Sequence, residues 1–305
     1  MKEKIAVGIV VYKPKLERLE ACISSVIDDV DRVYIYQNDN TPLPMQKNKK
    51  VLILNESRNL GLAYALNRIM EEAKKEAFQW VVTLDQDSIM PEGLIKEYQL
   101  HLGSANGILC PQVIDKRRVY MRPVRTGKIL SEVDMAITSG SCTSISAWDK
   151  VGGFDQWLFI DLIDNEFCKR LRINGFKILR LNQWVLDQEF GKILPKSRTV
   201  QRFWLFVSRA THNQNFAKFS YTKFVDPNRV YYTNRNIIYV NKKLKNYGPV
   251  AYENYNCKSY FGFIFAFMIP SVIRAKQKKA VLKATYTGII DGMKARVTEY
   301  KENAV

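Results

Sequence analysis

Short apolar runs alternate with helical patterns over the first half of the chain, and this alternation restricts the possible folds most. Residues 5–11 read IAVGIVV, a near-continuous run typical of a strand buried on both faces. Helical patterns are predicted over 16–27 and 62–78, and further strands over 33–36, 51–54 and 80–84. Strands and helices that alternate at this length predict an α/β fold, with a mostly parallel sheet flanked by helices.

Polar residues follow the predicted strands. They are Tyr12, 38–40, Asn55 and the pair Asp85 and Asp87. Open α/β sheets bind ligands outside the carboxyl ends of their strands, so we expect these side chains along one edge. Two carboxylates two residues apart can hold Mg²⁺ or Mn²⁺ against a diphosphate, because both ions prefer oxygen ligands. The alternative for the sequence Asp-Gln-Asp-Ser at this strand end is ordinary turn chemistry.

The second half of the chain has a different composition. After residue 108 the pattern is less regular, with a helix predicted over 166–173 and a strand over 176–180. From about residue 196 the chain is helical, aromatic and basic. We therefore expect a catalytic domain over 1–195 and a helical, basic C-terminal region over 196–305.

The charge of the chain is concentrated in this C-terminal region. Residues 1–195 contain 27 Lys and Arg against 25 Asp and Glu, whereas residues 196–305 contain 20 against 5. Such a region predicts an anionic partner: a membrane surface, a polyphosphate or a nucleic acid. A basic face that is simply solvated is the alternative.

Cysteine spacing indicates reduced thiols rather than a disulfide framework or a zinc site. The five cysteines are scattered and form no C-x-x-C pair; they are Cys22, Cys110, Cys142, Cys168 and Cys257.

The N-terminal residues 1–5 lead directly into a strand pattern, with no apolar signal-peptide region. We therefore expect a chain that is not secreted and that works in the cytoplasm.

Residues 260–273, YFGFIFAFMIPSVI, form the most apolar segment of the C-terminal region. The segment is short for a bilayer span, it contains Gly262 and Pro270, and four Lys and Arg follow it within residues 274–279. It fits an anchor at the surface of an anionic membrane. A buried core helix or an oligomer contact fits the same residues.

Several motifs occur in a fixed order along the chain. Asn59-x-Gly61 precedes Asp85-x-Asp87, and Gly152-Gly153-Phe154-Asp155 precedes FIDLIDNEFCKRLR at 159–172 and R-x-YY-x-x-RN at 229–236. Because the motifs occur in this order, the chain resembles glycosyltransferase family 2. The members of this family are inverting enzymes with the GT-A fold, which is built on a Rossmann-like mixed sheet. It is most similar to bacterial rhamnosyltransferase-like members, which act in surface polysaccharide synthesis. The resemblance covers roughly residues 5–240.

The resemblance implies a role for each motif in binding the sugar donor. Asp87 would bind a Mn²⁺ or Mg²⁺ ion directly, and Asp85 would assist it or contact the ribose. The remaining residues implied in nucleotide-sugar binding are Val11, Tyr12, Asn38, Asp39, Arg58, Asn59, Gly61, Asn67 and Gln86.

The resemblance also implies the residues that carry out transfer. The family's catalytic base lies at a helix start and corresponds to Asp164, which would deprotonate the acceptor hydroxyl for in-line attack. Ser139, Gly140, Asp161 and Glu166 would contact the acceptor or support the base. A helix N-cap is the alternative for Asp164 taken alone.

The chain departs from the family pattern at two places. The second strand end reads Gln-Asn-Asp-Asn over 37–40, where relatives often have Asp-Asn-Gly-Ser. Gln188 stands where relatives often have a metal-binding histidine. An amide oxygen can bind Mg²⁺ or Mn²⁺, so Gln188 is a third metal candidate, with Asp187 or Glu189 as alternatives.

The resemblance thus implies a metal-dependent, inverting glycosyltransferase. We expect it to move rhamnose from dTDP-rhamnose, or a hexose from a UDP-sugar, to a lipid-linked or growing saccharide at the inner face of the cell membrane. The C-terminal region would contact the membrane or form a homo-oligomer.

Two other function classes fit the sequence less well. A nucleic-acid binder would use the aromatic and basic residues over 221–235, but the chain shows no known nucleic-acid module. A sugar nucleotidyltransferase would need a Gly-rich basic loop after the first strand, where this chain has Tyr12-Lys13-Pro14.

Overall fold

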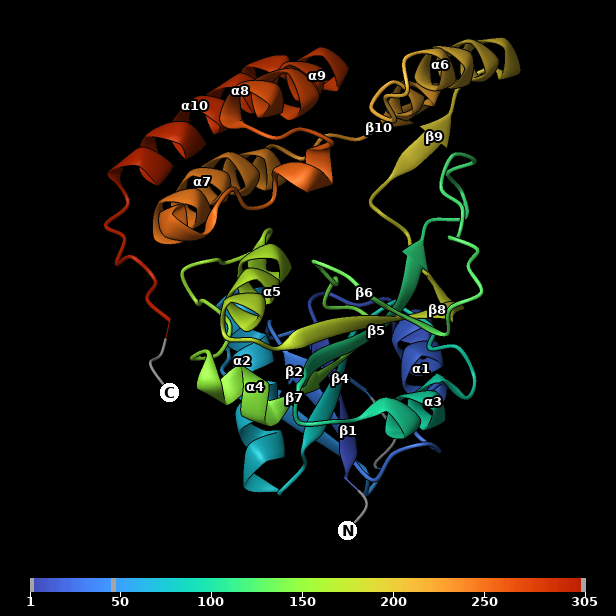
Figure 1. Ribbon diagram of the computed structural model, residues 1–305, viewed down its shortest axis with the longest axis vertical. Helices are drawn as coiled ribbons and strands as arrows, with labels where there is room; N and C mark the ends of the chain where they lie inside the picture. Colours follow the sequence, from blue (N-terminus) through green and yellow to red (C-terminus); the bar gives the residue numbers. More distant parts are fainter. Residues whose placement is uncertain (1–2, 45–47, 303–305) are drawn as a thin grey trace. The chain divides into compact units, whose positions relative to one another are not determined.

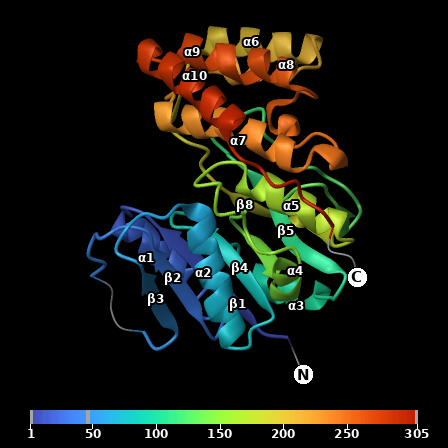
Figure 2. The same ribbon diagram turned by 90° about the vertical axis from the view of Figure 1, so that its left-hand side faces the viewer.

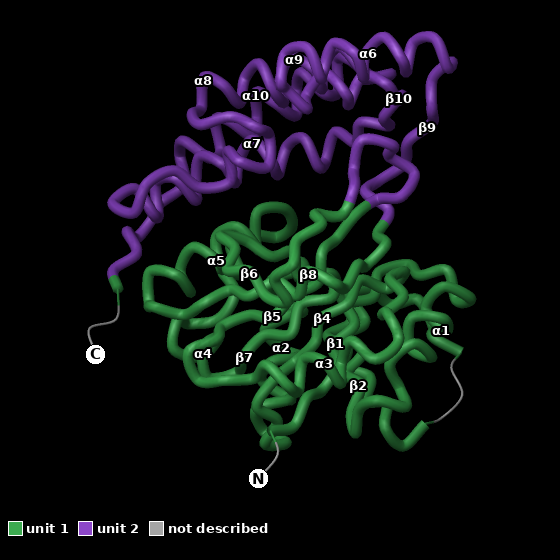
Figure 3. The backbone as a smooth tube through the Cα atoms, turned by 45° about the vertical axis from the view of Figure 1, so that its right-hand side comes forward, with its two compact units in different colours: residues 1–114, 123–188, 302–305 green, residues 115–122, 189–301 purple. Residues whose placement is uncertain are grey.

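The structure is a computed structural model that describes residues 3–44 and 48–302. The chain forms two compact units (Figure 3). Unit 1 takes in residues 1–114, 123–188 and 302–305, and unit 2 takes in residues 115–122 and 189–301. Unit 2 is therefore built from two segments that are far apart in the sequence.

Unit 1 is an α/β domain around one eight-stranded sheet, as far as the described residues go (Figure 1). Its strands are β1 (Ile5–Val11), β2 (Val33–Gln37), β3 (Val51–Asn55), β4 (Trp80–Asp85), β5 (Asn106–Ile114), β6 (Leu130–Glu132), β7 (Ser141–Ser144) and β8 (Lys177–Asp187). Its helices are α1 (Leu16–Ser24), α2 (Leu62–Lys75), α3 (Leu94–His101), α4 (Ile145–Lys150) and α5 (Ile163–Ile173).

The sheet has the order β3-β2-β1-β4-β7-β5-β8-β6. The neighbours from β3 to β4 are parallel, as are β5 and β8, whereas β7 runs antiparallel to β4 and β5, and β6 runs antiparallel to β8. The prediction of a mostly parallel, mixed sheet flanked by helices is confirmed. β1 lies between β2 and β4 at the centre of the parallel part.

Each face of the sheet packs on its own helices (Figure 2). Alternate residues of β1, such as Val7 and Ile9, join α1 and α3 in one core cluster, because successive strand side chains point to opposite faces. On the other face Gly8 lies against Ile69 of α2, where a Cβ atom at Gly8 would lie 2.4 Å from Ile69 Cγ2. No disulfide joins the five cysteines, four of which are buried.

Four element boundaries differ from the prediction by three residues or more. α2 ends at Lys75 instead of residue 78. α1 ends at Ser24 instead of residue 27, because Ser25 turns the chain and its hydroxyl donates to the Cys22 carbonyl at 2.7 Å. α5 begins at Ile163 instead of residue 166, directly after two residues with positive φ. β8 continues to Asp187 because it follows β5 past an irregularity in register at Pro111.

Unit 2 is mainly helical. Its helices are α6 (Arg198–Ala210), α7 (Pro227–Lys243), α8 (Tyr260–Phe263), α9 (Ile269–Arg274) and α10 (Lys278–Lys294), and its strands are β9 (Ile193–Pro195) and β10 (Tyr221–Lys223). A π-helical turn over Ile264–Met268 joins α8 to α9, and short 3₁₀ turns span Ala217–Ser220, Lys245–Tyr247 and Tyr252–Tyr255. Its net charge is +19, with 25 Lys and Arg against 6 Asp and Glu.

Small residues let α7 and α10 pack closely. A Cβ atom at Gly288 would lie 2.5 Å from the Tyr231 carbonyl oxygen, and one at Gly292 would lie 2.6 Å from the Arg235 carbonyl oxygen. The Tyr231 hydroxyl also donates to Asp291 Oδ2 at 2.8 Å. The two helices therefore approach through their backbones.

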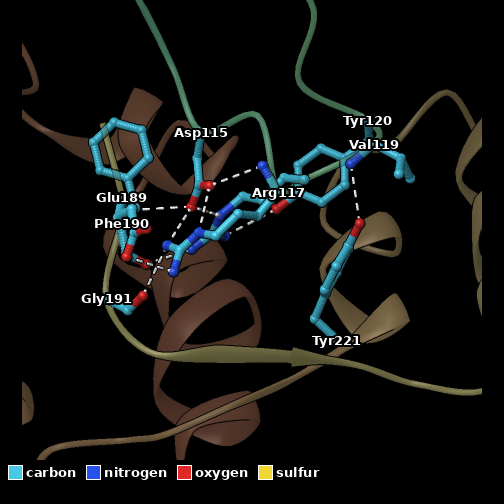
Figure 4. Close-up of polar contacts among 9 residues, drawn as sticks. Asp115, Arg117, Val119, Tyr120, Glu189, Phe190, Gly191 and Tyr221 are labelled. Atoms are coloured by element: carbon cyan, nitrogen blue, oxygen red, sulfur yellow. Dashed lines mark hydrogen bonds and ion pairs between the residues drawn. The ribbon is translucent and has the colours of Figure 1, made fainter. Parts of the chain in front are cut away.

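A network of ionic contacts around Asp115 joins the two segments that make up unit 2 (Figure 4). Both Arg117 and Arg118 donate to the buried Asp115 carboxylate, at 2.8 and 3.0 Å, and so does the Phe190 N–H at 3.1 Å. Arg117 also reaches Glu189 at 2.9 Å. Burial alone would raise the pKa of Asp115, but hydrogen bonds from the two arginines lower that pKa to about 2.

We predict that Gly8→Ala destabilises unit 1, because the added methyl group collides with Ile69. Overpacking of a buried site costs about 1–3 kcal/mol, which denaturant unfolding measures. Gly127→Ala is the matched control, since a Cβ atom there meets nothing within 4 Å. The double variant Gly8→Ala/Ile69→Ala should lose less than the sum of its single variants. Strict additivity would mean that the contact with Ile69 is not the cause.

Candidate functional site

The candidate site lies at the carboxyl edge of the parallel strands. The register pairs Val11 with Gln37, Gln37 with Asn55 and Val10 with Asp85, so that β1 to β4 end side by side. The polar residues that follow them are therefore neighbours, as we expected from the sequence. This edge is where ligands bind in open α/β sheets.

Gln86 fastens the ends of β1 and β4 to each other. Its side-chain oxygen accepts from the Tyr12 N–H at 2.8 Å, and its amide donates to the Tyr12 carbonyl at 3.3 Å. Gln86 thus supports the edge through the backbone of Tyr12. Tyr12 is 45% exposed, beside the buried Val11, and the Lys13 ammonium lies 5.3 Å from the centroid of its ring.

Asp39 and Asn38 bind backbone groups of neighbouring loops. Asp39 accepts from the N–H groups of Lys13 and Thr41. Burial raises the pKa of Asp39, but these backbone hydrogen bonds outweigh it and hold that pKa below its usual value. Asn38 Oδ1 accepts from the Leu60 N–H at 3.0 Å. Both side chains are buried and shape the loops around the edge.

The segment Asn59–Gly61 connects this edge to the loop before α5. Gly61 has a φ of 91°, and its N–H donates to Asn59 Oδ1 at 2.9 Å. A Cβ atom at Gly61 would lie 2.8 Å from the Phe159 carbonyl oxygen, which accepts from the Leu62 N–H at 2.7 Å. Glycine is therefore required here for both conformation and space. Arg58, just before this turn, is exposed.

Asn67 lies away from the edge, in the middle of α2. Its amide donates to the Phe154 carbonyl at 2.8 Å, and its oxygen accepts from the Phe154 N–H and the Trp148 indole N–H at 2.8 and 3.0 Å. These contacts occupy both ends of a buried amide, so they account for Asn67 as a support of the 153–154 loop.

Ser139 and Gly140 are also occupied within unit 1. The Ser139 hydroxyl is buried, accepts from the Asp85 N–H at 3.1 Å and lies 2.9 Å from the Ser88 hydroxyl. The Gly140 carbonyl accepts from the Tyr98 hydroxyl at 2.6 Å. The Gly140 N–H also donates to the Thr83 carbonyl at 2.7 Å, so both residues support the end of β4.

Asp85, Asp87 and Gln188 are the candidates for metal binding. Asp85 is half-buried and Asp87 is exposed at the end of β4. Gln188 follows β8, and its amide donates to Asp85 Oδ2. Its other side-chain atom, Oε1, is buried without a hydrogen-bond partner. A buried amide oxygen beside a carboxylate, with a second carboxylate two residues on, fits a divalent cation.

The metal candidates do not form a closed cage of protein ligands. Throughout residues 3–44 and 48–302, no three His, Cys, Asp or Glu side chains come together as a metal cluster. Mg²⁺ and Mn²⁺ do not need one, because they commonly bind through one or two carboxylates and complete their shell with phosphates and water. The residues therefore fit a cation that arrives with a diphosphate. Asp187 and Glu189 are both exposed.

Asp164 lies in the first turn of α5, after a backbone turn that L-residues rarely adopt. Asp161 and Leu162 have φ of 68° and 63°, and such adjacent left-handed residues commonly occur where strain serves a site. Burial, together with the charges of Asp161 and Asp85, raises the pKa of Asp164 to about 6, against the hydrogen bond from the Asn165 N–H. The charge of Asp85, at the end of β4, thus acts on Asp164.

Glu166 forms a buried ion pair that the sequence did not reveal. Both of its oxygens accept from Arg170 at 2.6 Å, and Arg170 also donates to the carbonyl groups of Val151 and Gly153. The pair therefore binds α5 to the Gly-Gly turn, which explains Glu166 as a support. The i,i+4 spacing of the two residues within the 159–172 motif was the available signal.

We predict that Asp164→Asn stabilises the protein at neutral and alkaline pH. The folded protein binds the Asp164 proton more tightly than the unfolded chain does, so protonation of Asp164 stabilises the folded state. This stabilisation is complete below about pH 4 and is lost as the pH rises through about 6. Asparagine avoids this loss, which amounts to at most about 3 kcal/mol for a shift of this size.

The measurement is urea unfolding at several pH values, with Asp28→Asn as an exposed control. The advantage of the Asp164 variant should vanish near pH 4 and level off above pH 6. A variant that is no more stable than the parent at pH 8 would contradict the raised pKa.

Comparisons with known proteins agree on the class of this domain. Residues 6–138 match the family model described as Glycosyl transferase family 2. Over 190 residues the chain is 27% identical to "dTDP-rhamnosyl transferase RfbF" from Shigella flexneri, a match that covers 56% of this chain and 64% of that protein. The match thus spans under two thirds of the relative's length.

A solved structure shares the fold at low sequence identity. GalNAc-T7, solved with UDP, GalNAc and Mn²⁺, superposes with a TM-score of 0.52 at 13% identity, covering 88% of this chain and 57% of that one. TarS 1–349 of S. aureus in complex with UDP gives a TM-score of 0.49 at 13% identity, covering 95% and 89%. The mixed α/β sheet flanked by helices has the GT-A fold, and over residues 6–138, under half of its length, the chain is similar to glycosyltransferase family 2.

Proposed function

We propose that this protein is an inverting glycosyltransferase that moves a sugar from a nucleoside-diphosphate donor to an acceptor hydroxyl. The observation that carries the proposal is Asp164, a carboxyl group with a pKa of about 6 that interacts electrostatically with Asp85 at the β4 edge. A general base works best when its pKa lies near the working pH, where it is ionised yet more basic than an ordinary carboxylate.

The donor would lie along the carboxyl edge of β1 to β4. Tyr12 would stack on the base, and the loops held by Asn38, Asp39 and Asn59 would surround the nucleoside. The exposed guanidinium group of Arg58 would approach the diphosphate. We favour dTDP-rhamnose as the donor because the sequence relative is a dTDP-rhamnosyl transferase; a UDP-sugar is the second candidate.

Asp85, Asp87 and Gln188 would hold Mn²⁺ or Mg²⁺ together with the donor phosphates. Such a cation, when bound, neutralises the charge that develops on the leaving diphosphate. The buried Oε1 of Gln188, which has no hydrogen-bond partner, supports its inclusion in the set. We propose that it acts where relatives use a histidine.

Asp164 would remove the proton from the acceptor hydroxyl. The hydroxyl oxygen then attacks the anomeric carbon while the bond from that carbon to the diphosphate oxygen breaks, which inverts the configuration. The proton remains on Asp164 until it passes to solvent. Asp161 would strengthen the base through its charge and contact the acceptor.

The acceptor we propose is a lipid-linked or growing saccharide at the cytoplasmic face of the cell membrane. The net charge of +19 on unit 2 supports an anionic partner there. Self-association through unit 2 is compatible with the same location.

Nucleotide binding tests the class of donor. We expect dTDP to raise the Tm in a Mn²⁺-dependent manner, with UDP and GDP as comparisons. The Asp87→Asn variant should lose the Mn²⁺ dependence, whereas Asp28→Asn should keep it. If none of the three nucleotides stabilises the protein with or without Mn²⁺, the proposal is wrong.

Asp164→Asn should abolish transfer while leaving donor binding nearly intact. We expect a loss of about 10²- to 10⁴-fold in kcat, the usual contribution of a general base. In the parent the rate should rise with pH through about 6, because only the ionised base is active. Asp161→Asn removes a charge that raises the pKa of Asp164, so this rise should move to lower pH. Equal loss of donor binding and transfer in Asp164→Asn would remove it from the role of base.

A further inference from the structure

Unit 2 carries a row of large apolar side chains that face solvent. Phe261, Phe265, Ile269 and Ile273 are between 41% and 71% exposed, and they recur every four residues along the helix formed by α8, the π-helical turn and α9. Residues four apart share one side of a helix, so these side chains form a continuous stripe. Contiguous exposed apolar patches of this kind mark interaction surfaces.

The opposite side of the same helix is also apolar. Phe263, Met268 and Pro270 are buried against the rest of unit 2. A surface helix of a soluble protein normally has a polar outer face, whereas this one is apolar all round. Its outer stripe is therefore not explained by packing within unit 2.

Helix α6 adds to the same surface. None of its residues is buried, and Phe203 and Phe206 are 57% and 68% exposed. Its Trp204 packs on Phe219, with ring centroids 4.9 Å apart. The Arg274 guanidinium, at the end of α9, lies 5.2 Å from the centroid of the same Phe219 ring. These contacts join α6 to α9, and both helices lie at the same end of unit 2 in two views (Figures 1 and 2).

The stretches of chain that build this surface carry only positive charge. Residues 190–225 and 254–290 contain thirteen Lys and Arg and no Asp or Glu. Lys276, Lys278 and Lys279 follow the apolar stripe directly and are exposed. Apolar side chains bordered by cations are complementary to an anionic lipid surface.

Two of these cations are half-buried beside neutral groups. Lys218 Nζ donates to Asn215 Oδ1 at 2.7 Å, and Arg274 Nε donates to the Pro270 carbonyl at 3.0 Å. Within the described parts of the chain, neither has a carboxylate within ion-pair distance. Burial, together with the charges of Arg274, Lys223 and Arg118, lowers the pKa of Lys218 to about 8. An anion would relieve this repulsion.

We propose that α6 and the helix over 260–274 form a docking face for an anionic lipid bilayer, in which Lys218 and Arg274 bind a lipid phosphate. The stripe from Phe261 to Ile273 enters the interface, and the lysines at 276–279 meet the headgroups. The docking face deepens the proposed function, because it places the enzyme beside a lipid-linked acceptor.

The helix lies on the membrane and does not cross it. By length and composition alone, residues 252–274 are one helical stretch that could span a bilayer, with 17% of its most apolar window buried. The regular part begins only at Tyr260, after a left-handed residue at Asn256, and its fifteen residues measure about 22 Å. A bilayer core of about 30 Å is too thick for it.

Vesicle sedimentation with the full chain tests the apolar stripe. We expect binding to vesicles that contain phosphatidylglycerol, little binding to pure phosphatidylcholine, and weakening by salt between about 0.1 and 1 M. Phe261→Ser/Phe265→Ser should weaken binding about tenfold or more, because two large apolar side chains no longer leave water. Leu100→Ser, an equally exposed position in unit 1, should leave it unchanged.

A second pair of variants tests the phosphate site. Lys218→Gln/Arg274→Gln should weaken binding to phosphatidylglycerol vesicles more than Lys15→Gln/Lys177→Gln, which removes the same charge from exposed positions in unit 1. If the two pairs of substitutions weaken binding equally, only a diffuse electrostatic attraction remains, and the proposed phosphate site is wrong.

The remaining outcomes separate docking from the proposed function. Failure to bind phosphatidylglycerol vesicles overturns the docking face, even if dTDP still stabilises the protein without vesicles. Vesicle binding without nucleotide binding would instead reject the glycosyltransferase proposal. If analytical ultracentrifugation shows an oligomer that Phe261→Ser/Phe265→Ser disperses, while vesicles are not bound, then the stripe is a contact between copies of this chain.

Discussion

The parallel pairing of β1 with both β2 and β4 is the constraint on which the candidate site depends. A strand buried on both faces has little room for charged or amide side chains along its length, and in β2 and β4 these groups, Gln37 and Asp85, stand at the strand ends. Parallel neighbours end at the same edge, and the register aligns Val11, Gln37 and Asn55 there and pairs Asp85 with Val10. The apolar core and the polar edge are therefore two results of one arrangement.

The edge is kept in shape by side chains that bind backbone groups far away in the sequence. Gln86 binds the backbone of Tyr12, Ser139 binds the N–H of Asp85, and Asn38 binds the N–H of Leu60. Each contact satisfies a backbone group that a loop would otherwise leave unpaired. They leave the carboxylates of Asp85 and Asp87 as the acidic groups at the end of β4.

The aspartates show how environment sets basicity in one chain. Asp39 accepts backbone N–H groups and Asp115 accepts two arginines, and both have a lowered pKa despite burial. Asp164 is half-buried, it feels the charges of Asp161 and Asp85, and its pKa is raised. The first two stabilise structure in their ionised form, whereas the third is less stable when ionised, as a proton acceptor has to be.

Much of the fold could be predicted because its signals are local. The β-branched run of β1 and the Asp-Gln-Asp strand end appear within a few residues of sequence, and the sheet follows from their alternation with helices. Roles that depend on distant partners could not be predicted. The amide of Asn67 and the hydroxyl of Ser139 resemble ligand groups in sequence, but their partners lie 87 and 54 residues away. The strained turn at Asp161 and Leu162 likewise arises from the folded chain, since neither residue type favours positive φ as glycine does.

The network around Asp115 bears on how such a chain can be divided or recombined. The chain enters unit 2 at residue 115, returns to unit 1 at 123 and enters unit 2 again at 189. A chain cut after residue 188 would keep Arg117 and Arg118 but lose Glu189, Phe190 and Gly191, which bind them. The buried Asp115 would also lose the Phe190 N–H. Exchange of the helical unit between related proteins therefore requires that residues 115–122 and 189–301 be replaced together, rather than by a single C-terminal graft.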